Sequence, residues 1–187
     1  MTKLHVSPKL ALPRDTVTST LVVYGGKGMG KTNFGSVLVE ELTKAHLRWS
    51  ALDPIGVWWG LRHSADGKGP GIECLILGGT HGDIPIEPTA GAVVADLVAD
   101  ETVNVVIDFS RKPSGVMWSI GEKVRFVTDY ALRLFQRQGD TSAGARPQLI
   151  DYQDSKVFLT DGGRARATVP SAPPTNEQLH DEVCSKV

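Results

Sequence analysis

The sequence predicts an α/β fold of three layers, with a mainly parallel central sheet that is incomplete at its C-terminal end. From Thr20 onward, short β-rich runs alternate with segments of helical spacing, as expected for parallel strands joined by crossover helices. A length of 187 residues suits one domain, and a content of 41% hydrophobic and 22% charged residues is typical of a globular chain. We expect an N-terminal extension over residues 1–18, the domain over 19–160, and a disordered tail over 161–187, where glycine and proline interrupt the pattern.

The first elements of the domain are predicted as strand, loop, helix and strand. Residues 20–24 are a β-rich run that ends in a glycine-rich loop. A helix is expected from near Lys31, because apolar side chains then recur at helical spacing, at Phe34, Val37, Leu38, Leu42 and Ala45. A second strand is placed at 49–52 and ends at Asp53 and Pro54, because proline cannot continue the ladder of hydrogen bonds.

The later elements continue this alternation. Strands are predicted at 74–77 and 103–107, with a helix over 90–101 between them. The run 103–107 is nearly all apolar, which is typical of a strand covered on both faces, so we place it at the sheet centre. The longest helix is predicted over 119–138, and a fifth strand over 148–150.

A phosphate-binding motif lies between the first predicted strand and the first predicted helix. The eight residues from Gly25 to Thr32 match the pattern GxxxxGK[ST] at every fixed position, in the strand and helix context that this motif requires. Phosphate oxygens need N–H donors on a concave backbone, which glycine permits, and the helix N-terminus adds the positive end of its dipole. Lys31 is the predicted catalytic residue, with its ammonium at the β- and γ-phosphates, and Thr32 is a predicted Mg²⁺ ligand. The expected nucleotide contacts are Gly25, Gly26, Lys27, Gly28, Met29, Gly30, Lys31, Thr32 and Asn33.

Two aspartates compete as the carboxylate that helps to hold Mg²⁺. Asp108 directly follows the apolar run 103–107, which is the form of a Walker B strand, although an aspartate here can also cap the turn at Ser110. Asp151 follows the predicted strand 148–150 and is the competing candidate. Neither aspartate is followed by the glutamate that would polarise an attacking water.

Three segments together resemble one group of ATPases. They are the loop GGKGMGKTNF at 25–34, the motif LDPIGVWWGL at 52–61, and the strand VIDFS at 106–110, which a long basic amphipathic helix follows. Over roughly residues 20–150 the chain resembles the HerA/FtsK-type ATPases, which are bacterial and phage DNA-translocating motors. The resemblance implies a RecA-like P-loop NTPase domain that binds and hydrolyses ATP with Mg²⁺, contacts DNA and forms a homo-oligomer, a hexamer.

The resemblance also bears on the metal carboxylate. In that family the strand with the metal-binding aspartate and catalytic glutamate follows the long helix, often behind an Arg-Pro pair. Residues 146–151, Arg-Pro-Gln-Leu-Ile-Asp, occupy that place, which would make Asp151 the Walker B aspartate and Asp108 a strand-end residue near the site. The family's Asp-Glu-Ala continuation is replaced here by Asp-Tyr-Gln-Asp at 151–154.

Other interpretations of the loop stay open. A glycine-rich turn without a ligand is one. A small-molecule or nucleotide kinase uses the same loop, but it needs a lid of arginines, which do not cluster in this sequence. A non-hydrolysing nucleotide-binding remnant would account for the missing glutamate. Because helical and strand periodicity are lost after Ile150, we hypothesise that the chain is a truncated or frame-shifted version of a longer motor.

Composition narrows the cellular setting. With 20 basic and 21 acidic residues the net charge is −1, so no chain-wide attraction to nucleic acid or anionic lipid is expected. Cys74 and Cys184 form no CxxC pair and have no histidine at metal-ligand spacing, so neither a disulfide framework nor a zinc site is indicated. The amino end has no signal-peptide core, and no apolar run is long enough to span a membrane. A cytoplasmic protein without membrane contact is therefore expected.

Several residues allow a functional and a structural interpretation. Asp53 is a candidate contact for the ribose or the metal shell, and equally a turn-forming aspartate before proline. Trp58 and Trp59 could stack on a base or a neighbouring subunit, although burial is the commoner fate of such side chains. The polar side of the helix 119–138 could face DNA or simply water; it carries Lys123, Arg125, Arg133 and Arg137.

Overall fold

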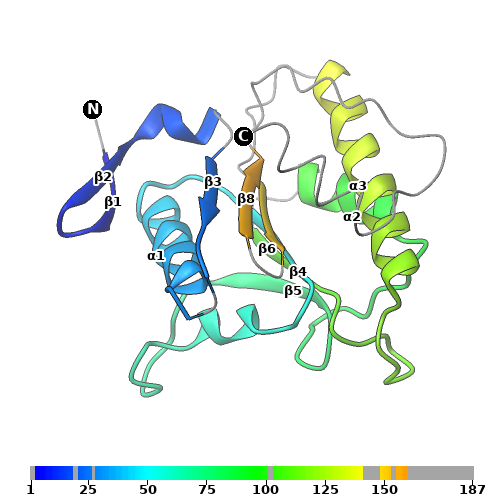
Figure 1. Ribbon diagram of the computed structural model, residues 1–187. Coiled ribbons are helices and arrows are strands. Elements are labelled where there is room, and N and C mark those ends of the chain that lie inside the picture. Colours follow the sequence, from blue (N-terminus) through cyan, green and yellow to red (C-terminus); the bar gives the residue numbers. More distant parts are fainter. Residues whose placement is uncertain are drawn as a thin grey trace.

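Alternating strands and helices form a mixed α/β fold in the computed structural model, which describes residues 3–18, 21–26, 28–100, 103–140, 148–152 and 155–159 (Figure 1). Side chains at 15, 18, 138–140, 148–152 and 155–159 are not part of that description. The main sheet consists of β3 (Leu21–Tyr24), β4 (Ser50–Asp53), β5 (Cys74–Gly78), β6 (Asn104–Asp108), β7 (Gln148–Tyr152) and β8 (Ser155–Leu159). The α-helices are α1 (Lys31–Lys44), α2 (Gly91–Asp100) and α3 (Ile120–Asp140). The tail expected over 161–187 lies outside the described residues.

The strand order of the main sheet is β3-β8-β7-β4-β6-β5. The strands β4, β6 and β5 are parallel to one another, in agreement with the predicted parallel strands, and Asp53 of β4 pairs in register with Asp108 of β6. β7 is parallel to β4, whereas β8 is antiparallel to both β7 and β3. Because β8 is antiparallel to both β3 and β7, β3 and β7 run in the same direction. β7 is parallel to β4, so β3 also runs in the direction of β4. The glycine-rich loop after β3 therefore leaves the sheet at the carboxyl ends of the strands, where Asp53 and Asp108 also lie.

Two features of the sheet differ from the prediction. The run around 103–107 becomes β6, which lies next to the edge strand β5 and not at the sheet centre. Its apolar composition reflects cover by strands at both sides and by helices on both faces, which a strand beside an edge can also have. Strand β8 is not predicted from the sequence, because this segment is short, begins with polar Ser155 and Lys156, and has no alternating pattern.

Helices pack on both faces of the sheet. Successive side chains of a strand point to opposite faces, so Val106 joins the core on the α1 side while Val105 and Ile107 join the core on the α2 and α3 side. The α1 side also holds Leu38, Val39, Leu42, Trp49 and Trp58, and the other side holds Val94, Val98, Phe109, Trp118, Phe126 and Tyr130. None of the helices in the described ranges is both long and apolar enough to cross a membrane.

The N-terminal segment packs on the first helix. Strands β1 (Lys3–Ser7) and β2 (Leu10–Pro13) form an antiparallel hairpin, followed by the 3₁₀ helix η1 (Arg14–Thr18). Leu4 and Val6 alternate with exposed residues and are buried in the core on the α1 side. The backbone N–H of His5 donates to Glu41 Oε2 of α1 at 2.9 Å. Residues expected as a mere extension thus contribute to this core.

Helix α3 begins with a capping box. The backbone N–H and hydroxyl of Ser119 donate to Glu122 Oε2 at 2.8 and 2.9 Å, and the Glu122 N–H donates back to Ser119 Oγ at 3.3 Å. Lys112 Nζ lies 2.8 Å from Glu122 Oε1. The hydrogen bond from Lys112, and those from Ser119, lower the pKa of Glu122 from 4.5 to about 2.

This capping box predicts an acid dependence of stability. Because the pKa of Glu122 is lower in the folded protein, its contribution is present above pH 4.5 and is lost as the pH falls toward 2. We expect Glu122→Gln to flatten the fall in unfolding free energy over that window, and Lys112→Met to flatten it in part. Urea titrations at closely spaced pH values measure this effect, and parallel curves for wild type and Glu122→Gln would contradict it.

Candidate functional site

The loop between β3 and α1 has the curled backbone that a phosphate loop needs. Gly28 and Gly30 have φ values of 80° and 83°, a left-handed conformation that favours glycine. The N–H of Met29 donates to the carbonyl of Gly26 at 3.3 Å, which closes a tight turn. Gly30 is the N-cap of α1, and no side chain caps this helix end. The first N–H groups of α1 therefore have no capping side chain as an acceptor.

Lys31 folds back over this loop. Its ammonium donates to the backbone carbonyl of Gly25, and to that of Gly26 at 3.0 Å. These two bonds place one full positive charge beside the helix N-terminus, where the helix dipole is also positive. Positive charge and free N–H donors at one point make a site suited to a polyanion. Lys27 lies outside the described residues, and Met29 and Asn33 are exposed at the loop surface.

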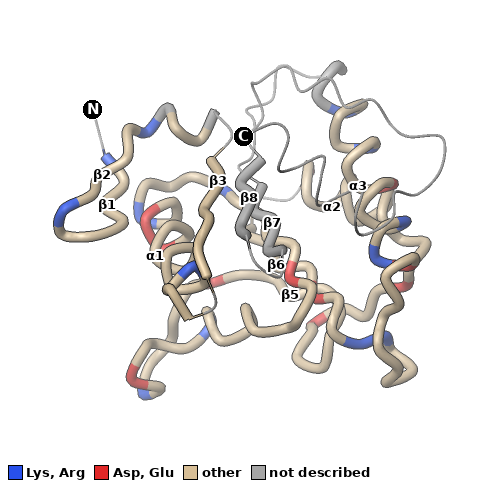
Figure 2. Tube along the Cα trace, viewed as in Figure 1, with Lys and Arg blue, Asp and Glu red and all other residues tan. Residues whose placement is uncertain are grey.

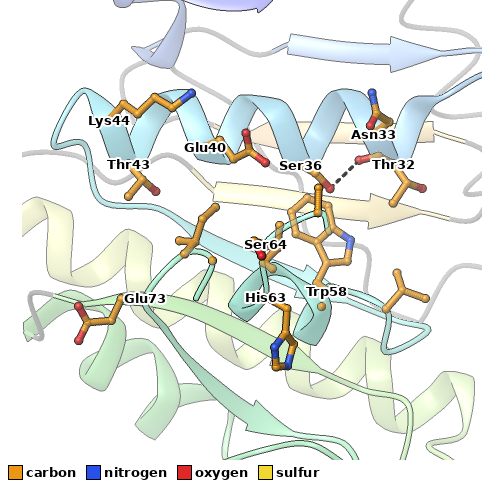
Figure 3. A pocket seen from close by; sticks show the side chains of 16 residues that line it. Thr32, Asn33, Ser36, Glu40, Thr43, Lys44, Trp58, His63, Ser64 and Glu73 are labelled. Atoms are coloured by element: carbon orange, nitrogen blue, oxygen red, sulfur yellow. Dashed lines mark hydrogen bonds between the residues drawn. The ribbon is translucent and has the colours of Figure 1, made fainter. Parts of the chain in front are cut away.

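A cavity of about 530 Å³ adjoins the end of the loop (Figure 3). One wall is the side of α1 that begins with Thr32 and Asn33, and the other is the segment 57–73, which includes the 3₁₀ helix η2 (Trp58–Arg62). Figure 3 shows the Trp58 ring directed toward α1 below Ser36, whose hydroxyl donates to the Thr32 carbonyl at 3.1 Å. Trp58, which is 3% exposed, thus packs the segment 57–73 against α1, the helix that follows the loop.

Asp53 organises the turn after β4. Its buried carboxylate accepts four backbone hydrogen bonds, at 3.1 and 2.9 Å on Oδ1 and at 2.7 and 2.8 Å on Oδ2; the donors are Ile55, Gly56, Val57 and Trp58. Burial raises the pKa of Asp53; the backbone hydrogen bonds from Trp58, Gly56 and Ile55 oppose that rise, and repulsion from Asp108 adds to it. Of the two interpretations of Asp53 in the sequence, these contacts are those of the turn-forming one.

Asp108 lies beside Asp53 at the end of β6. It is 2% exposed, and its Oδ1 accepts the backbone N–H of Ser110 at 2.7 Å, which is the turn-capping contact considered from the sequence. The carboxylate fits against a glycine at the end of β5: a Cβ on Gly79 would lie 2.0 Å from Asp108 Oδ2, and Gly79 also has a φ of 68°. Asp108 is therefore enclosed by its own turn and by a neighbouring glycine.

Asp151 lies near the carboxyl end of β7, on the same side of the sheet as Asp53 and Asp108. Ile150, the residue before it, pairs with Leu52, the residue before Asp53. The backbone of Asp151 therefore stands level with Asp53 and Asp108, and its side chain is not described. Among the residues with described side chains, no three carboxylate, histidine or cysteine groups gather as a metal site.

A lysine that the sequence does not single out for the site reaches this edge from α3. Lys123 Nζ donates to the carbonyl of Pro54 at 2.7 Å, across 69 positions of the chain. Burial lowers the pKa of Lys123, while attraction to Asp53 and Asp108 opposes that change. The sequence does hold a signal: Lys123 stands four residues before half-buried Val127, on the inward stripe of the helix, not on its outer side.

The other cations considered for DNA contact are largely engaged within the chain. Arg133 Nε lies 2.8 Å from Asp96 Oδ1, and Arg137 pairs with Asp100, so both bind acidic residues of α2. Arg125 is exposed. In the view of Figure 2, the Lys and Arg positions of the described residues lie scattered among Asp and Glu positions. Two of the four cations considered on α3 therefore pair with acidic side chains of the same chain.

Trp59 has a different environment from Trp58. Its ring stacks on His81 with centroids 4.1 Å apart and meets His63 edge-on at 6.0 Å. These contacts hold the half-buried Trp59 between histidines of the same chain.

Comparison with models of protein families, with curated proteins and with solved structures returned no match to this chain.

Proposed function

We propose that the chain binds Mg-ATP through the loop from Gly25 to Thr32, as the RecA-like ATP-binding domain of a HerA/FtsK-like DNA-translocating ATPase. The observation that carries the proposal is the fold of this loop, which curls at Gly28 and Gly30 and places the Lys31 ammonium against its own carbonyls at the start of α1. Two further observations support it: helices cover both faces of the sheet, and the loop and the strand-end aspartates share one edge. Ligands of open α/β sheets bind outside the carboxyl ends of the strands.

The residues present fit the phosphates. The α1 N-terminus has free N–H donors, and Lys31 can turn from the Gly25 and Gly26 carbonyls to phosphate oxygens. Bound Mg-ATP would supply the reactive γ-phosphate and the divalent charge. Thr32 lies at the start of α1 and provides a hydroxyl for the metal.

Strand order favours Asp151 over Asp108 as the metal carboxylate. One strand, β8, separates β7 from the loop-bearing strand β3, whereas three strands separate β6 from β3. With about 4.8 Å between neighbouring strands, the end of β7 is about 10 Å from that of β3, and the end of β6 about 19 Å. The Asp108 carboxylate also already accepts a hydrogen bond and is enclosed.

Binding without turnover is the alternative that one observation favours. No glutamate follows either aspartate: Tyr152 follows Asp151, and Phe109 follows Asp108 and packs edge-on with Trp118 and Phe126 at centroid distances of 5.2 and 5.0 Å. Phe109 is a buried apolar side chain and has no group that could orient a water molecule. Hydrolysis therefore requires a carboxylate from elsewhere, and a non-hydrolysing nucleotide-binding protein requires none.

One set of measurements separates these functions. We expect isothermal titration calorimetry to show Mg-ATP binding, and phosphate release to rise when duplex DNA is added. DNA-stimulated release supports the motor, binding without release supports the non-hydrolysing protein, and phosphate transfer to a small acceptor supports a kinase. A folded protein that binds neither Mg-ATP nor Mg-GTP would refute the proposal.

A further inference from the structure

Lys123 links α3 to the carboxyl ends of the strands, the side of the sheet from which the loop 25–30 emerges. Its hydrogen bond to the Pro54 carbonyl joins the first turns of α3 to the residue directly after β4. Of the other contacts of α3 described above, those of Arg133 and Arg137 lead to α2, and that of Glu122 leads to Lys112 in the loop after β6. Lys123 is thus placed to transmit a change in α3 to the strand ends.

The lysine also compensates two buried negative charges. Asp53 is fully buried, Asp108 is 2% exposed, and the two stand side by side in register. The two carboxylates repel each other, and attraction of Lys123 to both offsets part of that repulsion. The position of the lysine therefore affects the turn that Asp53 builds.

That turn reaches the phosphate loop. Asp53 holds the N–H groups of Val57 and Trp58 at 2.7 and 2.8 Å, and these residues line the same cavity as Thr32 and Asn33 (Figure 3). Trp58 shares a core cluster with Leu38 and Val39 of α1. A continuous path of short hydrogen bonds and packed side chains runs from α3 through the turn to α1.

We propose that Lys123 is a positioning residue that couples α3 to the phosphate loop, through the Pro54 carbonyl, the Asp53 turn and Trp58. The coupling is a property of the chain without ligand. Its consequence rests on the proposed function, because a change at α3 would then alter the affinity for Mg-ATP. By thermodynamic linkage, bound Mg-ATP would stabilise the start of α3 by the same coupling free energy.

Hydrogen–deuterium exchange of the whole chain tests the coupling without any nucleotide. We expect Lys123→Met to raise exchange about tenfold at the amides of 55–58 and also at those of 33–36, because one charge-assisted hydrogen bond is lost. Lys123→Arg, which keeps a cation and donors, should restore most of the protection. Arg133→Met is the matched control, since it removes another tie of α3 without touching the turn, and it should leave 33–36 within about twofold of wild type.

The outcomes decide the proposal separately from the proposed function. Exchange at 33–36 that is unchanged in Lys123→Met, or raised equally in Arg133→Met, overturns the coupling. Where Mg-ATP binds, it should slow exchange at 120–126 in wild type and not in Lys123→Met, and equal slowing in both proteins also overturns it. A wild type that binds no nucleotide refutes the proposed function, while exchange in the free protein still decides the role of Lys123.

Discussion

Lys31→Ala is expected to weaken Mg-ATP binding about 100-fold or more while the protein stays folded. Among the described residues of the curled loop, Lys31 carries the full positive charge, and its hydrogen bonds there go to backbone carbonyls. A charge-assisted hydrogen bond to phosphate contributes about 1.5–3 kcal/mol, and removing it also removes the Coulomb attraction to a polyanion. Calorimetric titration of wild type and variant at one ionic strength measures the difference.

The matched control for Lys31 is a second loss of one positive charge. Lys9 is exposed in the turn of the β1–β2 hairpin, away from the loop, so Lys9→Ala should change the Mg-ATP affinity by less than about twofold. Circular dichroism establishes that both variants are folded. Equal weakening by both substitutions would mean that net charge matters and that the loop does not hold the phosphates.

The parts of the fold that local patterns determine are predictable. The eight-residue motif predicts the loop and the start of α1 at Lys31, because phosphate-loop glycines, the helix stripe and the preceding strand all lie close together in the chain. The strands β4, β5 and β6 match their predictions closely, because apolar runs and the Asp53-Pro54 stop mark their ends.

Pairing between distant segments is not predictable in the same way. Nothing in the short segment 155–159 indicates that it inserts as β8 beside β3, since strand pairing depends on the rest of the sheet. The N-terminal hairpin shows alternation at Leu4 and Val6, but the alternation does not indicate that these side chains pack on the α1 side of the sheet. The position of β6 beside an edge strand likewise depends on where β7 and β8 are added.

The candidate site is predictable as residues but not as contacts. Asp53 and Asp108 stand out in the sequence because they end strands, yet their four and one described backbone hydrogen bonds follow from turns that the sequence only allows. The sequence interpretation places Lys123 with the other charges on the outer side of its helix, because a charged residue is usually solvated, although its spacing to Val127 is that of the inward stripe. Its actual partner, Pro54, comes from a segment 69 positions away and cannot be inferred from that spacing.

Gly79→Ala is expected to destabilise the fold by about 3 kcal/mol or more, because two costs add. Its φ of 68° is unfavourable for any side chain, and the new Cβ would lie 2.0 Å from Asp108 Oδ2, so a buried carboxylate must move. Gly67 provides a matched control, since it has the same φ of 68° and a Cβ added there would meet no atom within 4 Å. Gly67→Ala should therefore cost only about 1 kcal/mol, and urea unfolding followed by circular dichroism measures both variants.

The difference between these two alanine variants isolates the contact with Asp108, because the backbone cost is common to both. Equal losses would mean that Asp108 is not held against Gly79. The same pair also tests the metal assignment. If Asp151 is the carboxylate that serves Mg²⁺, then Gly79→Ala should keep its Mg-ATP affinity within about threefold at temperatures where it remains folded. A much larger loss of Mg-ATP affinity in Gly79→Ala, without such a loss in Gly67→Ala, would indicate that Asp108 is the carboxylate that serves Mg²⁺.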